Sequence, residues 1–249
     1  MTLTTGERGT GNGDRGAVEH ALVSMRRSEI LLLVAMLGLA ATFVRALAFT
    51  PLEATQGAAQ KIFYLHAPTA WAAFLAFGVV GACSLLYLLL KDAKLDRLAA
   101  SSAEVGVVFT TGVLCTGPLW ARPIWGTWWT WDARLTSTLF LWFVFFGYLV
   151  LRSAIAEPGQ RARLSAVLGI LGSLLVPFIH VSVYLFRTLH PMPVVLRTDG
   201  PQLPRVMLVT LLMSFATQTL LYAAMVWNRY SQAAVEDARE FVRAEAEDA

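Results

Sequence analysis

The chain has 249 residues, of which 56% are hydrophobic and only 15% are charged. Soluble domains average roughly 45–50% apolar and about 25% charged residues, so this composition excludes an ordinary soluble domain and predicts an integral membrane protein. The formal net charge of +3 is spread over polar tails and helix rims, and it gives no indication of nucleic-acid binding.

Six apolar stretches are long enough to cross about 30 Å of hydrocarbon, and they predict an all-α bundle of six transmembrane helices. The stretches are residues 30–49, 69–90, 98–119, 136–155, 164–186 and 206–227. One membrane domain, residues 29–228, is expected between a polar N-terminal tail (1–28) and a charged C-terminal tail (229–249). Since Arg45 interrupts an overlong apolar region, we expect the first span to be an uncleaved anchor rather than a signal peptide.

Basic residues are unevenly distributed between alternate loops. The two tails and the loops at residues 91–97 and 152–163 contain 13 of the 20 Lys and Arg residues. Cytoplasmic loops of membrane proteins carry the excess of basic residues, so both termini are predicted to be cytoplasmic. The other three loops, residues 50–68, 120–135 and 187–205, then share the extracytoplasmic face.

Two histidines and a tryptophan-rich segment fall on that face. His66 lies where the first outer loop enters the second span, and His190 follows the fifth span. Between them, eight residues hold four of the chain's eight tryptophans: Trp125-Gly126-Thr127-Trp128-Trp129-Thr130-Trp131-Asp132. Tryptophans at span ends usually belong to the interfacial aromatic belt, and this role is expected for Trp71, Trp120, Trp142 and Trp227. Four indoles in one short loop exceed the needs of a belt and indicate a binding surface.

The shape of the tryptophan-rich segment has two readings. On a helix, Trp125, Trp128, Trp129 and Asp132 fall on one continuous face. On an extended segment, Thr127, Trp129 and Trp131 share a side with Trp125. Pro118 and Pro123 indicate that the third span has ended before this segment, and Gly126 permits an unusual turn.

A flat, apolar, anionic ligand with a central metal would use every part of this face, and haem fits that description. Imidazole nitrogens supply axial ligands and indoles cover the macrocycle. The carboxylates of such a ligand would be neutralised by basic side chains, for which the candidates are Lys61, Arg122, Arg134, Arg187 and Arg197. Iron bound by both His66 and His190 has no open position, which suits carrying haem better than activating oxygen.

A third histidine leaves alternatives open. His180 lies inside the fifth span, three residues after Pro177. The proline ring frees the Ser173 carbonyl. A buried imidazole there has either a structural or a haem-related role, and we weigh the two equally. A b-type membrane cytochrome that pairs His180 with His66 or His190 is the alternative function. A permease for an amphipathic or lipid-linked substrate is the third. The two cysteines, Cys83 and Cys115, are expected to be unpaired core residues at different depths.

The segment from Trp125 to Thr136 resembles the WGxxWxWDxRLT signature of the CcmC family, the haem-handling membrane proteins of cytochrome c maturation. Its Arg134-Leu135-Thr136 ending separates CcmC from related haem-handling families. The patterns Tyr64-Leu65-His66-x-Pro68, Pro177-x-x-His180 and Thr188-Leu189-His190 match in order and spacing, and the six-span layout covers residues 30–227. The chain departs from the pattern at Leu185-Phe186, where relatives often carry two tryptophans, and at Pro191, where a polar residue is common.

The resemblance implies a haem-binding and haem-transfer protein of the bacterial cytoplasmic (inner) membrane, not an enzyme, with its site on the periplasmic side. It implies that His66 and His190 are the axial ligands of a transient, non-covalent haem b. The haem platform implied by the signature comprises Trp125, Gly126, Trp128, Trp129, Trp131, Asp132 and Arg134. The implied partners are membrane lipid, the haem chaperone CcmE, the small protein CcmD and the CcmA/CcmB ABC transporter. Because the chain has no phosphate-binding loop, any ATP-driven step would belong to another subunit.

Overall fold

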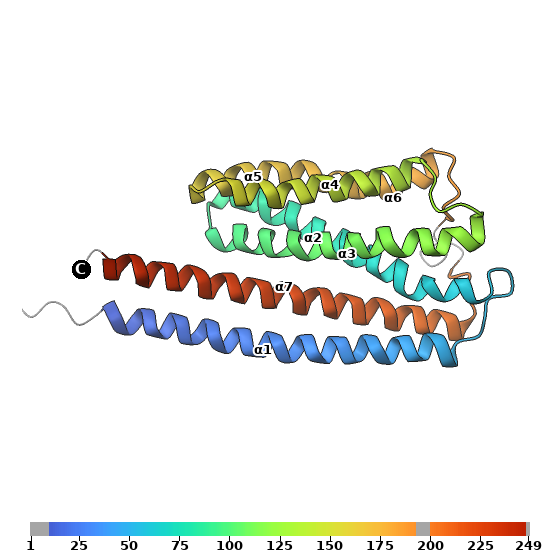
Figure 1. Cartoon of the computed structure of the whole chain (residues 1–249), viewed down its shortest axis with the longest axis horizontal. Helices are drawn as coiled ribbons and strands as arrows, with labels where there is room; N and C mark the ends of the chain where they lie inside the picture. Colours follow the sequence, from blue (N-terminus) through green and yellow to red (C-terminus); the bar gives the residue numbers. More distant parts are fainter. Residues whose placement is uncertain (1–9, 193–199, 248–249) are drawn as a thin grey trace, which may run out of the picture.

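The computed structural model describes the backbone of residues 10–192 and 200–247, and the side chains of residues 22–192, 200–240 and 243. This part of the chain is largely helical (Figure 1). Its elements are α1 (Thr10–Val44), the π-helical turn η1 (Arg45–Phe49), the 3-10 turn η2 (Ala58–Ile62), α2 (Phe63–Leu90), α3 (Ala93–Trp125), α4 (Ala133–Ala154), α5 (Pro158–Ser173), α6 (Leu175–Leu185) and α7 (Arg205–Glu247).

Six segments of the described chain are long and apolar enough to cross a membrane, which confirms the predicted all-α, six-span membrane fold. They are Leu22–Phe49, Ala58–Leu90, Ala93–Trp125, Ala133–Ala154, Pro158–Leu185 and Arg205–Glu240. All six run roughly parallel to one long axis of the molecule (Figure 1). We call the end at which α1 begins and α7 finishes the tail end, and the opposite end, which carries His66, Trp125–Asp132 and His190, the histidine end.

The helices form two unequal groups. In Figure 1, α1 lies along α7 on one side, and α4, α5 and α6 lie on the other side of α2 and α3. The largest core cluster lies between α2 and α3 and this second group, where Phe77 of α2 stacks on Phe145 of α4 with ring centroids 3.8 Å apart. The central pair, α2 and α3, therefore supports both the α1/α7 pair and the outer helices.

The α1/α7 pair is longer than the predicted spans and projects beyond the other helices at the tail end (Figure 1). Helix α7 has 43 residues, roughly 65 Å at 1.5 Å per residue, about twice the hydrocarbon thickness. Near residue 228 the two helices share polar contacts: Ser24 Oγ lies 2.9 Å from Ser231 Oγ, and Asn228 donates to Ser28 Oγ. Hydropathy locates only the apolar part of each helix, so the boundaries at residues 28 and 229 mark no break in helical structure.

Two expectations based on proline and cysteine are wrong. Pro118 and Pro123 do not end the third span, because α3 continues through both to Trp125. Each proline removes only one backbone donor, and the packing of this last part of α3 against α2 offsets that loss. Cys115 is exposed rather than a core residue, whereas Cys83 is buried as expected, and both are free thiols.

The fifth span, expected as one stretch, is broken beside Ser173, the residue whose carbonyl Pro177 leaves without a helical donor. Helix α5 ends at Ser173 and α6 begins at Leu175. The side chain of His180 is exposed on α6 and not turned toward the bundle. The expected burial of this imidazole near the freed carbonyl is therefore wrong, because the hydropathy of a span does not say which side of the helix faces inward.

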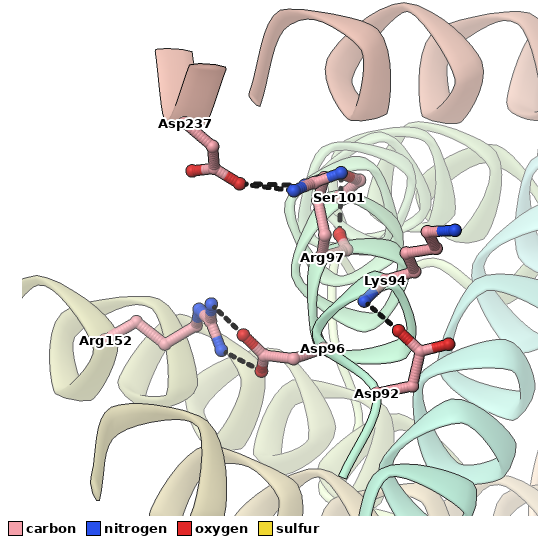
Figure 2. Close-up of polar contacts among 7 residues, drawn as sticks. All are labelled: Asp92, Lys94, Asp96, Arg97, Ser101, Arg152 and Asp237. Atoms are coloured by element: carbon pink, nitrogen blue, oxygen red, sulfur yellow. Dashed lines mark hydrogen bonds and ion pairs between the residues drawn. The ribbon is translucent and has the colours of Figure 1, made fainter. Parts of the chain in front are cut away.

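Ion pairs join helices at the tail end, and α3 contributes to three of them. Figure 2 shows two of them: Arg152 of α4 donates to both carboxylate oxygens of Asp96 at 2.6 and 2.9 Å, and Arg97 donates to Asp237 of α7. In the third, Arg229 of α7 donates to Glu104. These contacts join α3 to both neighbouring groups of helices.

Candidate functional site

Four parts of the chain meet at the histidine end. His66 lies on the first turn of α2, and Arg134 lies on the first turn of α4. Trp125 is the last residue of α3, and His190 follows the end of α6 by five residues. Arg134 Nη1 lies 3.3 Å from His190 Nδ1, so the fold brings these two predicted site residues into contact at the end of the bundle where α2 begins with His66.

The orientation of the His66 ring is set by α3. Its Nδ1 lies 2.9 Å from Thr116 Oγ1, and the Thr116 hydroxyl donates to the Gly112 carbonyl at 2.7 Å. When that hydroxyl hydrogen goes to Gly112, the oxygen accepts a hydrogen bond from His66 Nδ1–H. The lone pair is then on Nε2, which is the arrangement that a metal-binding imidazole requires.

Close packing against α3 holds the same ring in place. A Cβ atom at Gly117 would lie 3.3 Å from His66 Cε1, so only a residue without a side chain leaves the ring its present room. The Trp120 ring meets the imidazole edge-on with centroids 5.8 Å apart, and Trp120 Nε1 donates to Gln56 Oε1 at 3.1 Å. Trp120 therefore belongs to the site and not only to the aromatic belt to which sequence reasoning assigned it.

His190 is held by a short turn after α6. Its backbone N–H donates to Thr188 Oγ1 at 3.1 Å, and its ring meets Trp125 edge-on with centroids 6.5 Å apart. Its Nδ1 lies 3.0 Å from the Pro191 carbonyl oxygen and 3.3 Å from Arg134 Nη1. Burial, and then the charge of Arg134, lower the pKa of His190 to about 4. The ring is consequently neutral at neutral pH, which is the form that binds metals.

The tryptophan-rich segment is not a helix. Helix α3 ends at Trp125, and Gly126 takes the left-handed conformation with φ of 76°, its N–H donating to the Arg122 carbonyl at 3.1 Å. A side chain at this φ would be strained, which explains glycine here. Of the two readings, the non-helical one is therefore correct.

The indoles of this segment differ in exposure. Trp129 and Trp131 lie side by side with ring centroids 5.9 Å apart, as the extended reading predicts. Trp131 is 78% exposed and Trp128 55% exposed. The buried Nε1 of Trp129 has no hydrogen-bond partner among the described residues. The segment thus offers two free aromatic surfaces and one unused donor.

Asp132 has a positioning role that its side-chain contacts explain. Its Oδ1 accepts from the backbone N–H groups of Arg134 at 2.9 Å and Leu135 at 3.0 Å, which caps the start of α4. Its Oδ2 accepts from the Thr130 hydroxyl at 2.7 Å. Asp132 therefore fixes the tryptophan-rich segment to the start of α4 and so sets the position of Arg134 in the first turn of that helix.

The candidate cations for ligand carboxylates are not equivalent. Lys61 donates to the backbone carbonyls of Ala46 (2.7 Å) and Thr50, so it caps the end of η1. Arg122 donates to the Gly126 carbonyl. Arg134 lies against His190, and Arg187 is exposed with no ion pair among the described residues. Arg197 lies outside the described residues.

Sequence reasoning overlooked Thr116, Gly117 and Trp120, which hold His66. A usable signal was present, because Thr116 and Trp120 are four residues apart on one face of α3. His180, which the alternative b-type cytochrome requires, is exposed on α6 and its side chain makes no hydrogen bond within the described chain. The geometry therefore gives that alternative no support.

Comparison with known proteins identifies the family. The family model CcmC, described as "Heme exporter protein C", matches residues 17–245. The chain belongs to the CcmC family. It is 39% identical to heme exporter protein C of Bradyrhizobium diazoefficiens over 178 residues, which is 72% of this chain and 68% of the relative. It is 36% identical to heme exporter protein C of Haemophilus influenzae over 189 residues, which is 75% of this chain and 76% of the relative.

Proposed function

We propose that this chain binds haem at the extracytoplasmic face of the bacterial cytoplasmic membrane and transfers it to a periplasmic haem chaperone for cytochrome c maturation. His66 and His190 are the proposed axial ligands, and the tryptophan-rich segment is the proposed platform. Its role is binding and delivery rather than catalysis. The description of its family as "Heme exporter protein C" supports haem as the ligand.

One observation carries this proposal: His190 contacts Arg134 and Trp125 at the same end of the bundle as His66, whose Nδ1 lies against Thr116 Oγ1 and whose Nε2 is the ring nitrogen left for a metal. The surrounding groups fit a porphyrin. Trp128 and Trp131 present exposed indole surface, and the unpartnered Trp129 Nε1–H has the chemistry to meet an anionic edge. Two imidazole ligands favour a six-coordinate iron that is carried and not used for oxygen chemistry.

The partners are also proposals. Both tails are expected on the cytoplasmic side, which places the histidine end on the periplasmic side, where it would meet a CcmE-like chaperone. The exposure of Trp131 supports a platform that a second protein can reach. Association with CcmD and with the CcmA/CcmB ABC transporter would supply the ATP-driven step, and membrane lipid surrounds the spans.

The direct test is the absorption spectrum of the purified full-length protein after addition of haem b. We expect a low-spin, six-coordinate spectrum in the wild type and its loss in both His66→Ala and His190→Ala. His180→Ala is the matched control, because this histidine is exposed on α6, and it should leave the spectrum unchanged. A wild type without haem absorption, or His66→Ala and His190→Ala variants with unaltered spectra and unaltered delivery, would refute the proposal.

A further inference from the structure

The two site histidines differ in what surrounds Nδ1. For His66, the only hydrogen-bond partner of Nδ1 in the described chain is Thr116 Oγ1, an acceptor because its own hydrogen goes to Gly112. For His190, the same nitrogen faces two groups: the Pro191 carbonyl oxygen at 3.0 Å and Arg134 Nη1 at 3.3 Å. The tautomer of His66 is therefore fixed, whereas that of His190 is contested.

The tautomer of His190 is not fixed because the two neighbours of its Nδ1 have opposite hydrogen-bonding roles. A carbonyl oxygen only accepts hydrogen bonds, and a guanidinium only donates them. When Nδ1–H donates to Pro191, the lone pair is on Nε2, and that nitrogen can bind a metal. When Arg134 donates to Nδ1, the ring hydrogen is on Nε2, and that nitrogen cannot. In its present position Arg134 thus opposes metal binding by His190.

A carboxylate is the group that can draw Arg134 away. Arginine pairs with carboxylates through two parallel, charge-assisted hydrogen bonds, which are about twice as strong as bonds between neutral partners. Within the described chain the Arg134 side chain has no carboxylate partner, since the oxygens of Asp132 accept from backbone N–H groups and from Thr130. The start of α4 is fixed by that cap, so only the Arg134 side chain needs to move.

We infer that Arg134 couples recognition of a ligand carboxylate to the tautomer of His190, a coupling that deepens and rests on the proposed haem-binding function. His66 is then the constitutive axial ligand. His190 is the conditional one, available only for a porphyrin whose carboxylate engages Arg134. Loss of the carboxylate contact returns the guanidinium to Nδ1, so His190 is also the ligand that dissociates first when haem is handed on.

The test compares two ligands in the wild-type protein, iron protoporphyrin IX and its dimethyl ester, which lacks free carboxylates. The acid is expected to give a low-spin, six-coordinate spectrum. The ester is expected to give a five-coordinate spectrum in wild type, the same as in His190→Ala. In Arg134→Met the ester becomes six-coordinate, because no guanidinium competes for Nδ1. Arg205→Met is the matched control, because this exposed arginine begins α7 at the same end and is not a candidate carboxylate partner, and it should keep the wild-type difference between acid and ester.

A readout without ligand complements these spectra. In haem-free protein labelled with ¹⁵N at histidine, Arg134→Met is expected to shift the His190 signals fully to the Nδ1–H form, while the His66 signals stay unchanged. Six-coordinate spectra of wild type with both the acid and the ester would overturn the inference, and this result does not depend on whether Arg134→Met folds. A five-coordinate spectrum of the ester in a folded Arg134→Met variant would overturn it as well. A wild type that binds neither porphyrin would instead refute the proposed function itself.

Discussion

The two ends of this helical bundle differ in their charged and aromatic groups. At the tail end, Asp96 and Arg97 of α3 pair with Arg152 of α4 and Asp237 of α7 (Figure 2). Glu104 of α3 pairs with Arg229 of α7. At the histidine end, the Nε1–H of Trp129 is buried without a partner, and Trp131 is 78% exposed. Buried polar groups are normally hydrogen-bonded, and unpartnered buried atoms also occur toward the tail end, at Tyr148 and Arg161, so the difference between the ends lies in the ion pairs and the exposed indoles. The comparison separates an end that stabilises the fold from an end that is prepared for a ligand.

Breaking the Asp96–Arg152 pair should have the largest effect on stability and none on the site. Both side chains are only 16% exposed, and removing one partner of a buried pair costs about 3–5 kcal/mol because the other charge is left unpaired. Asp96→Ala is expected to lower the free energy of unfolding by that amount, measured by denaturation in detergent. Asp92→Ala, which removes only the cap bond to the Lys94 N–H, is the control and should cost about 1 kcal/mol. Loss of the haem spectrum in folded Asp96→Ala would contradict the separation of the two ends.

At the histidine end, Thr116→Val should weaken haem binding without destabilising the fold. The substitution keeps the shape of the side chain and removes the acceptor that orients His66 Nδ1. Loss of a group that orients a metal ligand typically costs about 10–100-fold in affinity. Haem titration measures this change. Thr111→Val is the control, because Thr111 accepts from Trp142 Nε1 and does not contact His66. Equal affinities in Thr116→Val and wild type would show that Thr116 does not set the tautomer.

A comparison of two tryptophans sharpens the contrast further. Trp129→Phe removes an N–H that has no partner in the described chain, so we expect unchanged stability of the haem-free protein and about fivefold weaker haem binding, equivalent to one hydrogen bond of about 1 kcal/mol. Trp120→Phe removes a donor that is bonded to Gln56, so its haem-free stability should fall by about 1 kcal/mol. Thermal unfolding with and without haem distinguishes the two. Equal losses in the haem-free state would mean that the Trp129 N–H is satisfied within the protein.

The smallest effect on stability is expected for the most exposed of these ion pairs, Arg97–Asp237. The Asp237 side chain is 58% exposed, and exposed ion pairs contribute about 0–1 kcal/mol. Asp237→Asn should therefore lower the unfolding free energy by less than about 1 kcal/mol, and the difference from wild type should shrink further in high salt. A loss as large as that of Asp96→Ala would show that the projecting part of α7 stabilises the body of the bundle.

Hydropathy alone predicted the six spans, because crossing a bilayer requires long apolar helices whatever their neighbours are. It could not predict where helices stop. Pro118 and Pro123 are within α3, since packing against α2 outweighs the donor lost at each proline. The mean hydropathy of a span also does not distinguish one side of the helix from another. The exposure of His180 and Cys115 could therefore be known only from the packed structure.

The site was predicted from residue types whose chemistry is unusual at a membrane boundary, namely His66, His190 and the clustered tryptophans. Their supporting residues were not, because Thr116, Gly117 and Trp120 are ordinary residues of an apolar helix. Their importance comes from the side of α3 that faces α2, which is a property of the packing. The contest over His190 Nδ1 likewise depends on a contact between residues 56 positions apart.

The pairing of α1 with α7 has a consequence for biosynthesis. Arg45 Nε donates to the Thr210 hydroxyl, and Ser24 meets Ser231, so the polar groups of the first helix are satisfied by the last one, 165 and 207 residues later. At about 5–20 residues per second, the ribosome needs roughly 10–40 s to synthesise the intervening chain. During that interval α1 lacks α7, the helix with which it makes these polar contacts. These contacts of the first span therefore cannot form until the last span has been synthesised and inserted.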